Sequence, residues 1–353
     1  MTKTSSGNFF EDFSLEQKIT HATPRTVTEG DVSLYTALFG PRFAVQSADS
    51  FAMDIGYPAA PVDDLLVFHI VFGKTVPDIS LNAIANLGYA DCRFLMPVFP
   101  GDSLSATSEV IGLRELSNGK AGVVYVRSRG ENQNGEPVLD YVRWVMVSKR
   151  DAASPAPEPV VPELPERVSP DQLAEFQVPI DTGRYDTALS GSSHFWNDYE
   201  VGEKIDHVDG MTIEEAEHQL ATRLYQNTAK VHFNAHAQKD SRFGKRLIYG
   251  GHVISLARAL SFNGLGNAFH LAAINGGSHV SPCFAGDTVF AWSQILECEE
   301  IPGRSDIGAL RVRSLATKDH PCFGFPDKGD DDSYEPSVLL DLDTWVILPR
   351  KNS

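Results

Sequence analysis

The hydrophobic and polar positions of the 353 residues predict the same order of elements twice. Each half begins with an extended segment and a helix. An apolar helix then precedes several runs of β-branched and apolar residues, some of them alternating with polar ones. We expect the apolar helices over about residues 62–72 and 252–261. A helix that is apolar almost all round must lie on the core face of a sheet. The pattern therefore predicts an α+β fold in which an antiparallel sheet wraps around a central helix, once in each half.

Matching segments at a nearly constant spacing indicate that the chain is an internal duplication. FEDFSLEQKITH, which ends at His21, resembles WNDYEVGEKIDH, which ends at His207, at an offset of 186 residues. PVFPGDSL resembles PCFAGDTV at an offset of 185, and Trp144 corresponds to Trp345 at an offset of 201. The larger final offset indicates an insertion in the polar stretch 319–336, which we expect to be an exposed loop.

A proline-rich segment, SPAPEPVVPELPERVSP, lies between the two copies. It predicts an extended, semi-rigid linker, because proline is excluded from the interior of helices and sheets. We expect an N-terminal unit over residues 1–150, a linker over 151–190 and a C-terminal unit over 191–353. The two units are expected to bury one face each against the other.

The first helix of the second half is expected to begin near Thr212, because Glu215 three residues later completes a capping-box pattern. The central apolar helix that follows is preceded by Gly250–Gly251. For the first helix, the spacing of apolar residues predicts a buried face made of Ile213, Ala216, Leu220 and Leu224.

Composition excludes several classes of function. Lys and Arg number 30 against 47 Asp and Glu, and the formal net charge of −17 argues against nucleic acid or an anionic lipid surface as a partner. The most apolar stretch, LLVFHIVFG, is far shorter than the roughly 20 residues of a membrane span, and the N-terminus lacks the apolar core of a signal peptide. Four scattered cysteines with no C-x-x-C spacing predict neither a disulfide framework nor a zinc site. We therefore expect a cytoplasmic protein with no membrane partner.

Polar residues present in only one copy are candidates for function, whereas residues kept in both copies are expected to be architectural. Gln46 of the first copy corresponds to His232 of the second, and Pro41 corresponds to Asn227. The second copy also has Gly250–Gly251 at the start of its apolar helix, where the first copy reads PVDDLL. Histidine can take and return a proton near neutral pH, and asparagine can orient a water or a hydroxyl. Glycines at a helix N-terminus leave backbone N–H groups for an oxygen that becomes an enolate.

Structural explanations stay open for each of these residues. His232 can be an ordinary half-buried histidine, the two glycines can serve close packing, and Asn227 can cap a loop. HFNAH places His232 and His236 four residues apart, but it lacks the glutamate of H-E-x-x-H, so we predict no metal site. His69, within the first apolar helix, is expected to be a hydrogen-bonded core histidine.

These residues resemble the MaoC-like (R)-specific hydratases, which carry two hot-dog folds in one chain. The family motif Gly-Asp-x-Asn-Pro-Ile-His matches 226–232, and FGKRLIYGG resembles the family segment Phe-Gly-x-x-Ile-x-His-Gly. The opening EDFSLEQKITHATPRTVTEGD and the linker extend the resemblance over nearly the full length. The resemblance implies a tandem hot-dog fold and reversible hydration of an enoyl-CoA thioester, with no cofactor apart from the CoA of the substrate.

The resemblance also implies roles for single residues. His232 corresponds to the catalytic histidine, Asn227 lies at the position of the catalytic aspartate, and Gly250 corresponds to the oxyanion-hole glycine. Tyr249 replaces a family histidine and, with Gly251, is expected to contact the substrate. The first copy lacks both catalytic residues, so we expect it to be inactive and to form walls for the acyl chain. Because Asn227 cannot titrate, we hypothesise a syn addition in which His232 takes a proton from a water held by Asn227 and returns a proton to the α-carbon.

The resemblance favours mesaconyl-CoA, whose hydration yields β-methylmalyl-CoA, as the substrate. Alternatives are a general (R)-specific trans-2-enoyl-CoA hydratase, an acyl-CoA thioesterase and a non-catalytic acyl-CoA-binding module, since one fold can host several functions. Open strand edges also lead us to expect a homo-oligomer such as a homodimer. The second carboxylate of mesaconyl-CoA requires a basic partner, and the candidates close to the catalytic histidine in sequence are Lys230, Arg223, Arg242 and Arg246.

Overall fold

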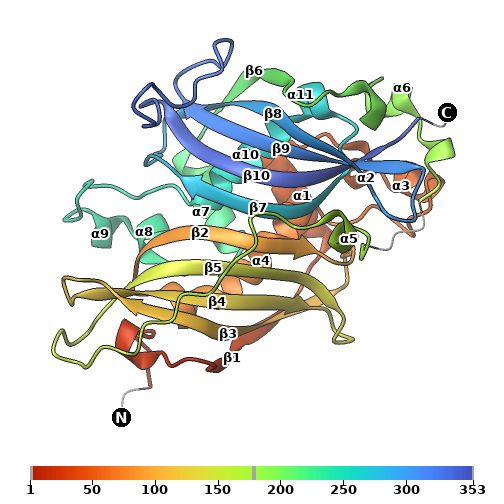
Figure 1. Ribbon diagram of the computed structural model, residues 1–353. Coiled ribbons are helices and arrows are strands. Elements are labelled where there is room, and N and C mark those ends of the chain that lie inside the picture. Colours follow the sequence, from red (N-terminus) through yellow and green to blue (C-terminus); the bar gives the residue numbers. More distant parts are fainter. Residues whose placement is uncertain (1–2, 177–179, 352–353) are drawn as a thin grey trace.

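A computed structural model describes residues 3–176 and 180–351, and its main feature is one ten-stranded antiparallel sheet (Figure 1). The strand order is β1-β3-β4-β5-β2-β7-β10-β9-β8-β6, so the strands before and after the linker form neighbouring halves joined by β2 and β7. The strands are β1 (Lys18–Thr26), β2 (Ala83–Phe94), β3 (Ser103–Glu115), β4 (Ala121–Glu131), β5 (Pro137–Ser148), β6 (Lys204–Thr212), β7 (His270–His279), β8 (Thr288–Glu300), β9 (Ile307–Lys318) and β10 (Val338–Pro349).

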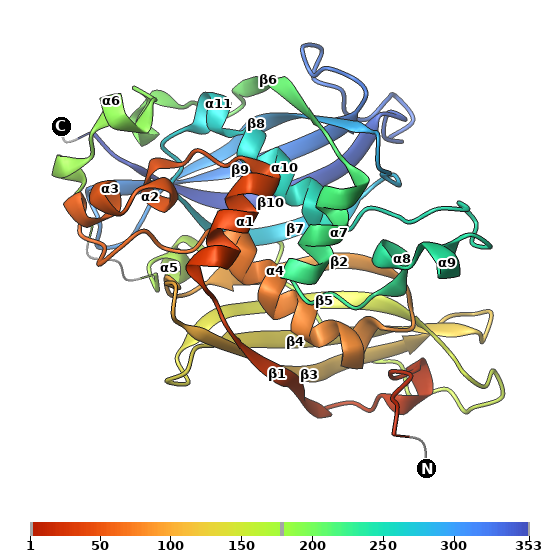
Figure 2. The ribbon, with the colours of Figure 1, turned by 180° about the vertical axis from the view of Figure 1, so that it is seen from behind.

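Two central helices, α4 (Asp64–Thr75) and α10 (Gly250–Leu260), lie together on one face of the sheet (Figure 2). Both begin within two residues of their predicted starts, and every residue of α4 from Leu65 to Thr75 is buried. The other helices are α1 (Glu29–Phe39), α2 (Ala44–Ser47), α3 (Asp49–Asp54), α5 (Pro170–Leu173), α6 (Thr187–Ser190), α7 (Glu215–Leu224), α8 (Lys230–Phe233), α9 (Ala235–Gln238) and α11 (Phe262–Leu265), with 3₁₀ turns at Phe10–Asp12, Thr182–Arg184 and Trp196–Asp198 and a π turn at Val76–Ser80.

The internal duplication is visible in hydrogen bonds that repeat at equivalent positions. His21 Nε2 lies 2.8 Å from Ser108 Oγ in the first half, and His207 Nε2 lies 2.9 Å from Ser293 Oγ in the second. All four side chains are buried. Residues present in both copies therefore support the fold, as the comparison of the two copies predicted.

The two central helices meet at equivalent residues. His69 Nε2 of α4 lies 2.9 Å from Ser255 Oγ of α10, and these residues correspond to each other at the offset of 186. The contact therefore lies on a pseudo-twofold axis between the two copies. Apolar residues surround it, among them Phe68 at 0% exposure and Leu256 at 1%. Burying each side chain of this size contributes about 1.5–3 kcal/mol, so the helices hold the halves together.

The proline-rich linker runs across the outer face of the sheet and contacts both halves (Figure 1). Val160 forms an isolated β-bridge with Leu113 of β3. Further on, the Val168 backbone N–H donates to Asn275 Oδ1 of β7 at 2.8 Å, and Trp345 Nε1 of β10 donates to the Val168 carbonyl at 3.0 Å. The proline-rich segment is extended as predicted up to α5, whereas the rest of the predicted linker range also contains the 3₁₀ turn Thr182–Arg184 and helix α6. Residues 177–179 of that range lie outside the described residues.

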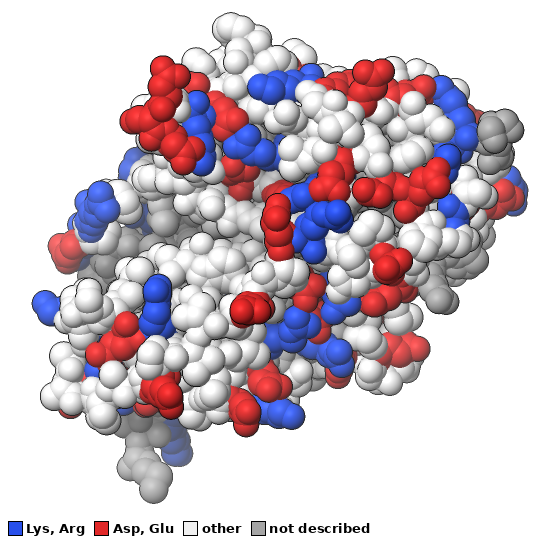
Figure 3. Space-filling view, viewed as in Figure 1, with Lys and Arg blue, Asp and Glu red and all other residues white. Residues whose placement is uncertain are grey.

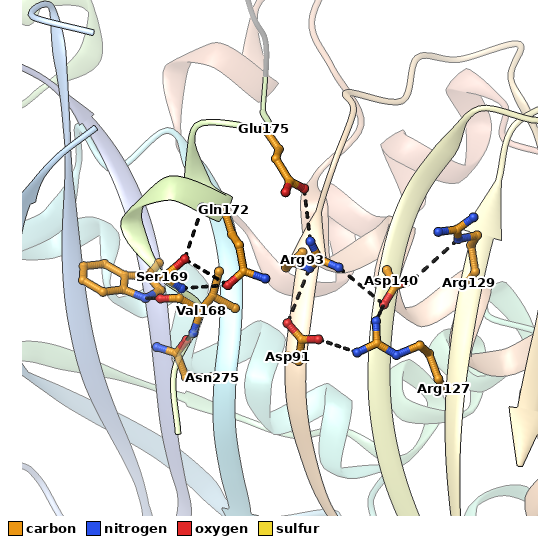
Figure 4. Close-up of polar contacts among 11 residues, drawn as sticks. Asp91, Arg93, Arg127, Arg129, Asp140, Val168, Ser169, Gln172, Glu175 and Asn275 are labelled. Carbon is orange, nitrogen blue, oxygen red and sulfur yellow. Dashed lines mark hydrogen bonds and ion pairs between the residues drawn. The ribbon is translucent and has the colours of Figure 1, made fainter. Parts of the chain in front are cut away.

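A network of arginines and carboxylates joins the end of α5 to the sheet (Figure 4). Glu175 pairs with Arg93 of β2 at 3.1 Å, and Arg127 of β4 pairs with Asp140 of β5 at 2.8 Å. The second half has an equivalent pair between β9 and β10, in which Arg313 Nη2 lies 2.7 Å from Asp341 Oδ2. These charges compensate one another and belong to the scaffold.

The prediction for the first helix of the second half was wrong in its start and in two of its four buried residues, whereas Ile213 and Leu224 are buried as predicted. Thr212 ends β6, because its backbone continues the pairing with β8 and its hydroxyl lies 2.8 Å from Thr288 Oγ1. Helix α7 begins at Glu215, and it buries His218, Ala221, Thr222 and Leu224 while Ala216 and Leu220 are exposed. Packing against α1 and α10 selects this face, and that packing is invisible to the spacing of apolar residues alone.

The inserted stretch 319–336 connects β9 to β10 and is mostly exposed, as predicted. Residues 330–332 are three exposed aspartates, and acidic side chains gather at the upper left of the molecule, the side on which β9 leads into this loop (Figure 1 and Figure 3). The loop is anchored by Trp292 Nε1, which donates to the Pro326 carbonyl at 2.9 Å. None of the helices in residues 3–176 and 180–351 combines the length and apolar composition that a membrane span requires.

Candidate active site

The N-terminus of α10 carries no side-chain cap. Tyr249 occupies the N-cap position in extended conformation, and Gly250 and Gly251 form the first helical residues. A Cβ atom at Gly250 would lie 2.3 Å from His279 Cε1, and one at Gly251 would lie 2.5 Å from His69 Cε1. The glycine pair therefore does serve close packing, since it lets two imidazole rings approach the helix start. The same geometry leaves first-turn N–H groups and the positive end of the helix dipole for a ligand oxygen.

His232 lies on α8 with one ring nitrogen bound and the other free. Its Nδ1 lies 3.0 Å from the Leu247 carbonyl oxygen, and because a carbonyl can only accept, Nδ1 carries the hydrogen. Nε2 is then an unprotonated acceptor. The ring is half-buried, and removal from solvent lowers the pKa of His232 to about 4, so the side chain is neutral at neutral pH. His232 is thus ready to accept a proton at Nε2.

Asn227 is buried in the loop that leads to α8. Its Oδ1 accepts from the Ala229 backbone N–H at 3.0 Å, so the carboxamide oxygen holds the loop. The amide nitrogen has no acceptor among the described residues and is the group that can face a ligand. Gln226 adopts a left-handed φ of 54°, where the resembling motif has glycine, which makes the turn before Asn227 strained for this residue.

The same loop lies on the central helix of the other half. A Cβ atom at Gly73 of α4 would lie 1.9 Å from the Tyr225 carbonyl oxygen, so only glycine permits this approach. Tyr225 also packs its ring against His69 of α4, with centroids 4.5 Å apart. The site is therefore built between the two copies.

Three further histidines surround the start of α10. His218 Nε2 accepts from the Tyr249 backbone N–H at 2.9 Å, and its ring centroid lies 6.2 Å from that of His232 and 5.6 Å from that of His252. Burial, followed by the neighbouring His252, His232 and Arg246, lowers the pKa of His218 to about 2. Burial and the nearby His232 lower the pKa of His279 to about 4. In the described part of the chain no carboxylate pairs with His232, so the site is uncharged at neutral pH.

Tyr249 connects His232 to the first half. Its ring centroid lies 5.5 Å from that of His232, and its hydroxyl lies 3.4 Å from His69 Nδ1. His69 is fully buried and hydrogen-bonded to Ser255, as predicted for a core histidine. The Ser255 hydroxyl also accepts from Tyr35 at 3.0 Å. Tyr249 is thereby held in place from both helices.

The four basic residues near His232 in sequence do not enter this buried space. Lys230, Arg223 and Arg242 are exposed. Arg246 is partly buried, but its charge is compensated by Glu215 at 2.6 Å. His236 is exposed, and no group of three or more potential metal ligands occurs within the described ranges.

His218 and His279 are site residues that the sequence reasoning missed. Both occur in only one copy: at the offset of 186, His218 corresponds to Val32, and strand register aligns His279, opposite Leu340, with Phe94 of the first half. The comparison of the copies could therefore have found them. For His218 the wrong helix face concealed the signal, and for His279 the strand register was needed.

Comparison with known proteins gives consistent matches over the whole chain. A family model described as mesaconyl-CoA hydratase matches residues 1–324. The β-methylmalyl-CoA dehydratase of Chloroflexus aurantiacus is 63% identical over 99% of both chains. The mesaconyl-CoA hydratase of Cereibacter sphaeroides is 59% identical over 99% of this chain and 100% of that one.

Solved structures agree with these matches. The crystal structure of a MaoC domain protein dehydratase from Chloroflexus aurantiacus has 62% identity and a TM-score of 0.97, and the match covers 100% of both chains. A Mycobacterium tuberculosis protein described as having a double hot-dog fold has 23% identity and a TM-score of 0.74, over 98% of this chain and 99% of that one. The predicted tandem hot-dog fold is therefore confirmed.

Proposed function

The chain belongs to the mesaconyl-CoA hydratase family, and on this premise we propose that it is a hydro-lyase that interconverts mesaconyl-CoA and β-methylmalyl-CoA. The observation that carries the proposal is the placement of a neutral imidazole, His232, beside the uncapped N-terminus of α10. Hydration of an enoyl thioester needs a base for water and donors for the oxygen that becomes an enolate. Both are present here.

In the proposed mechanism a single imidazole moves the proton in both steps. His232 Nε2 takes a proton from water while the water oxygen bonds to the β-carbon of the enoyl group. The displaced electron pair moves to the thioester oxygen, which the first-turn N–H groups of Gly250 and Gly251 stabilise. The imidazolium then returns its proton to the α-carbon on the same face, which makes the addition syn.

The low pKa of His232 suits the second step more than the first. An imidazole with a pKa of about 4 is a weak base, but its protonated form is a strong acid that gives up the proton readily. Asn227 takes no part in proton transfer in this proposal, and its amide nitrogen orients the water or the new hydroxyl. This division of roles follows from the lack of a carboxylate partner for His232 among the described residues.

The exposed cations fit a role at the entrance of the site. CoA carries phosphates, and Lys230, Arg223 and Arg242 have the exposure and charge to meet them. Arg246 acts on the protein itself, since it joins Glu215 and Gln219 of α7 to the segment before Tyr249. Assembly as a homodimer, a cytoplasmic location and the absence of a cofactor stay predictions.

A direct comparison of substrates tests the proposal. The purified protein is given mesaconyl-CoA or crotonyl-CoA, and loss of the enoyl absorbance and release of free thiol are followed in parallel. We expect loss of absorbance without thiol release, with a higher kcat/KM for mesaconyl-CoA. Thiol release would indicate a thioesterase, and equal or better use of crotonyl-CoA would indicate a general enoyl-CoA hydratase. Tight binding without conversion would indicate a binding module.

A further inference from the structure

Arg143 of β5 is a fully buried cation with no carboxylate partner in the described part of the chain. Its Nη2 donates to Thr75 Oγ1 at 2.7 Å, and both Nη atoms lie 3.4 Å from Ser80 Oγ. The guanidinium stacks on the ring of Phe72, with Cζ 4.2 Å from the centroid. Its Nε has no acceptor among the described residues. Hydroxyl groups alone do not compensate a buried positive charge, and proteins bury such charges paired or for a functional reason.

The surroundings of Arg143 supply further donors and no acid. Tyr141, two residues earlier on the same face of β5, is fully buried, and its hydroxyl lies near the side-chain hydroxyls of Ser128 and Thr75. Burial lowers the pKa of Arg143, and the groups that oppose this effect are the hydroxyls of Tyr141, Tyr89 and Tyr249. The Nε–H of Arg143, which lacks an acceptor among the described residues, and the Tyr141 hydroxyl are donors of the kind that bind a carboxylate.

Two chains of contacts connect Arg143 to the proposed active site. Phe72, on which the guanidinium stacks, has its ring centroid 5.8 Å from that of Tyr249, the neighbour of His232. Tyr89 is the cross-strand partner of Arg143, and its hydroxyl lies 3.3 Å from Nε2 of His279. Two side chains, Phe72 and Tyr249, therefore lie between Arg143 and His232 along the first chain of contacts.

The equivalent position in the other half shows how the chain itself compensates a buried arginine. Thr344 takes the place of Arg143, and Arg258 of α10 takes the place of Phe72. The charge of Arg258 is opposed by the nearby carboxylates of Asp63 and Asp64, which raise its pKa against the effect of burial. Two carboxylates of the first half thus face the partly buried Arg258. Within residues 3–176 and 180–351, no carboxylate pairs with Arg143 in the same way.

We propose that Arg143 binds the carboxylate at the far end of a dicarboxylic acyl-CoA, with Tyr141 as a second donor. The inference rests on the proposed function and names the residue that selects its substrate class. A planar guanidinium can donate two parallel hydrogen bonds to a carboxylate, which fixes both position and orientation. An acyl chain without that carboxylate leaves the buried charge unpaired, so the site discriminates against it.

The test measures the ratio of kcat/KM for mesaconyl-CoA to that for crotonyl-CoA. We expect Arg143→Gln to lower this ratio by about 100-fold or more, because one member of a buried charge pair is removed. Arg143→Lys keeps the charge but loses the fork of donors, and it should give an intermediate ratio. Arg258→Gln is the control, since it removes a partly buried arginine from the other half and should leave the ratio unchanged.

Folding and the proposed function are separated by two further readouts. Circular dichroism confirms that each variant is folded; if Arg143→Gln is not, Arg143→Lys and Tyr141→Phe must still lower the ratio. Inhibition by the saturated analogues methylsuccinyl-CoA and butyryl-CoA should show the same loss of preference. A wild-type enzyme that does not hydrate mesaconyl-CoA would defeat the proposed function. A wild-type preference for mesaconyl-CoA that survives in the folded Arg143 and Tyr141 variants would overturn the assignment of Arg143 alone.

Discussion

The two central helices begin in opposite ways, although they occupy equivalent places in the two halves. At the start of α4, Asp63 Oδ1 accepts from the Leu65 backbone N–H at 2.9 Å, and Asp64 Oδ2 accepts from the Leu271 backbone N–H at 2.8 Å. At the start of α10, Tyr249 and Gly250 replace these two acids and provide no side-chain cap. One helix N-terminus is closed by carboxylates of the chain, and the other is left for a ligand.

This difference shows how two copies of one fold can come to differ at equivalent positions: the N-terminus of α10 is open to a ligand, whereas that of α4 is capped. A capped N-terminus offers no donors to a thioester oxygen, and two carboxylates beside it repel an oxygen that becomes negative. The first half instead supplies parts to the site of the second: Gly73 receives the Asn227 loop, and His69 holds Tyr249. In the proposed function the first copy is inactive in catalysis, yet it still contributes residues to the site of the second copy.

The largest effect is expected when His232 and the equivalent residue of the first half, Gln46, are replaced by alanine in separate variants. We expect His232→Ala to lower kcat/KM for mesaconyl-CoA by about 10²–10⁴-fold, because general acid–base catalysis is removed. Gln46→Ala, at the equivalent position, should keep most of the activity, since Gln46 only donates to the Phe269 carbonyl at 2.6 Å. Steady-state kinetics on folded variants decides the matter. Near-normal turnover of His232→Ala would show that another group moves the proton.

A second comparison alters the two helix starts. Gly250→Ala should lower kcat/KM on the order of 10²-fold, because the new Cβ would collide with His279 and displace the helix N–H donors. Asp64→Ala removes the carboxylate at the equivalent position of the first half, which accepts from the Leu271 backbone N–H, and should lower the melting temperature with little effect on kcat/KM. Kinetics and thermal unfolding of both variants give the comparison. Equal losses of activity would argue that both helix starts serve catalysis.

The lowered pKa values of the buried histidines predict that acid destabilises the folded protein, in part through histidines of the second half. Burial lowers the pKa of His218 to about 2, so below its ordinary pKa of 6.5 the unfolded chain binds a proton that the folded chain does not. Stability is therefore full above about pH 6.5 and falls with acid, by at most about 1.4 kcal/mol per pH unit for one such histidine.

His218→Val tests this by placing the residue of the first half at the equivalent position of the second. We expect a shallower loss of unfolding free energy between pH 6.5 and 5, measured by urea denaturation. His236→Val, which replaces an exposed histidine, is the control and should leave the slope unchanged. An unaltered slope in His218→Val would mean that His218 is protonated in the folded state.

The smallest effect is expected from Asp63→Asn in the closed site. Burial, followed by the nearby Asp64, raises the pKa of Asp63 to about 6, so the folded chain keeps a proton that the unfolded chain loses as pH rises from about 4 to 6. Stability falls over that window, opposite in sign to the histidine effect, and asparagine removes the fall. At pH 7 the net change should be under about 1 kcal/mol, because Arg258 also loses a nearby carboxylate. Urea denaturation at pH 4 and pH 7 measures it, and activity should not change.

Much of the fold followed from comparing the chain with itself. The constant offset identified the two copies, and the apolar runs located α4 and α10 within a few residues. The comparison also pointed to His232, Asn227 and Gly250, because each differs from its counterpart in the first half. The comparison of the two copies did not predict which face of α7 is buried, because packing against neighbouring helices decides that face.

What the chain alone determined was the duplication, the fold class and the half that differs in titratable residues. These are properties of residue type and spacing, which are local. Tertiary structure decided which side chains meet: His218 and His279 at the start of α10, and Arg143 of the first half beside a site of the second. Lys230, Arg223 and Arg242 are near His232 in sequence but lie on the surface, while a buried arginine 89 positions away lies two side chains from it. The reason is physical, because charge compensation and desolvation depend on distance in space, and sequence separation does not record that distance.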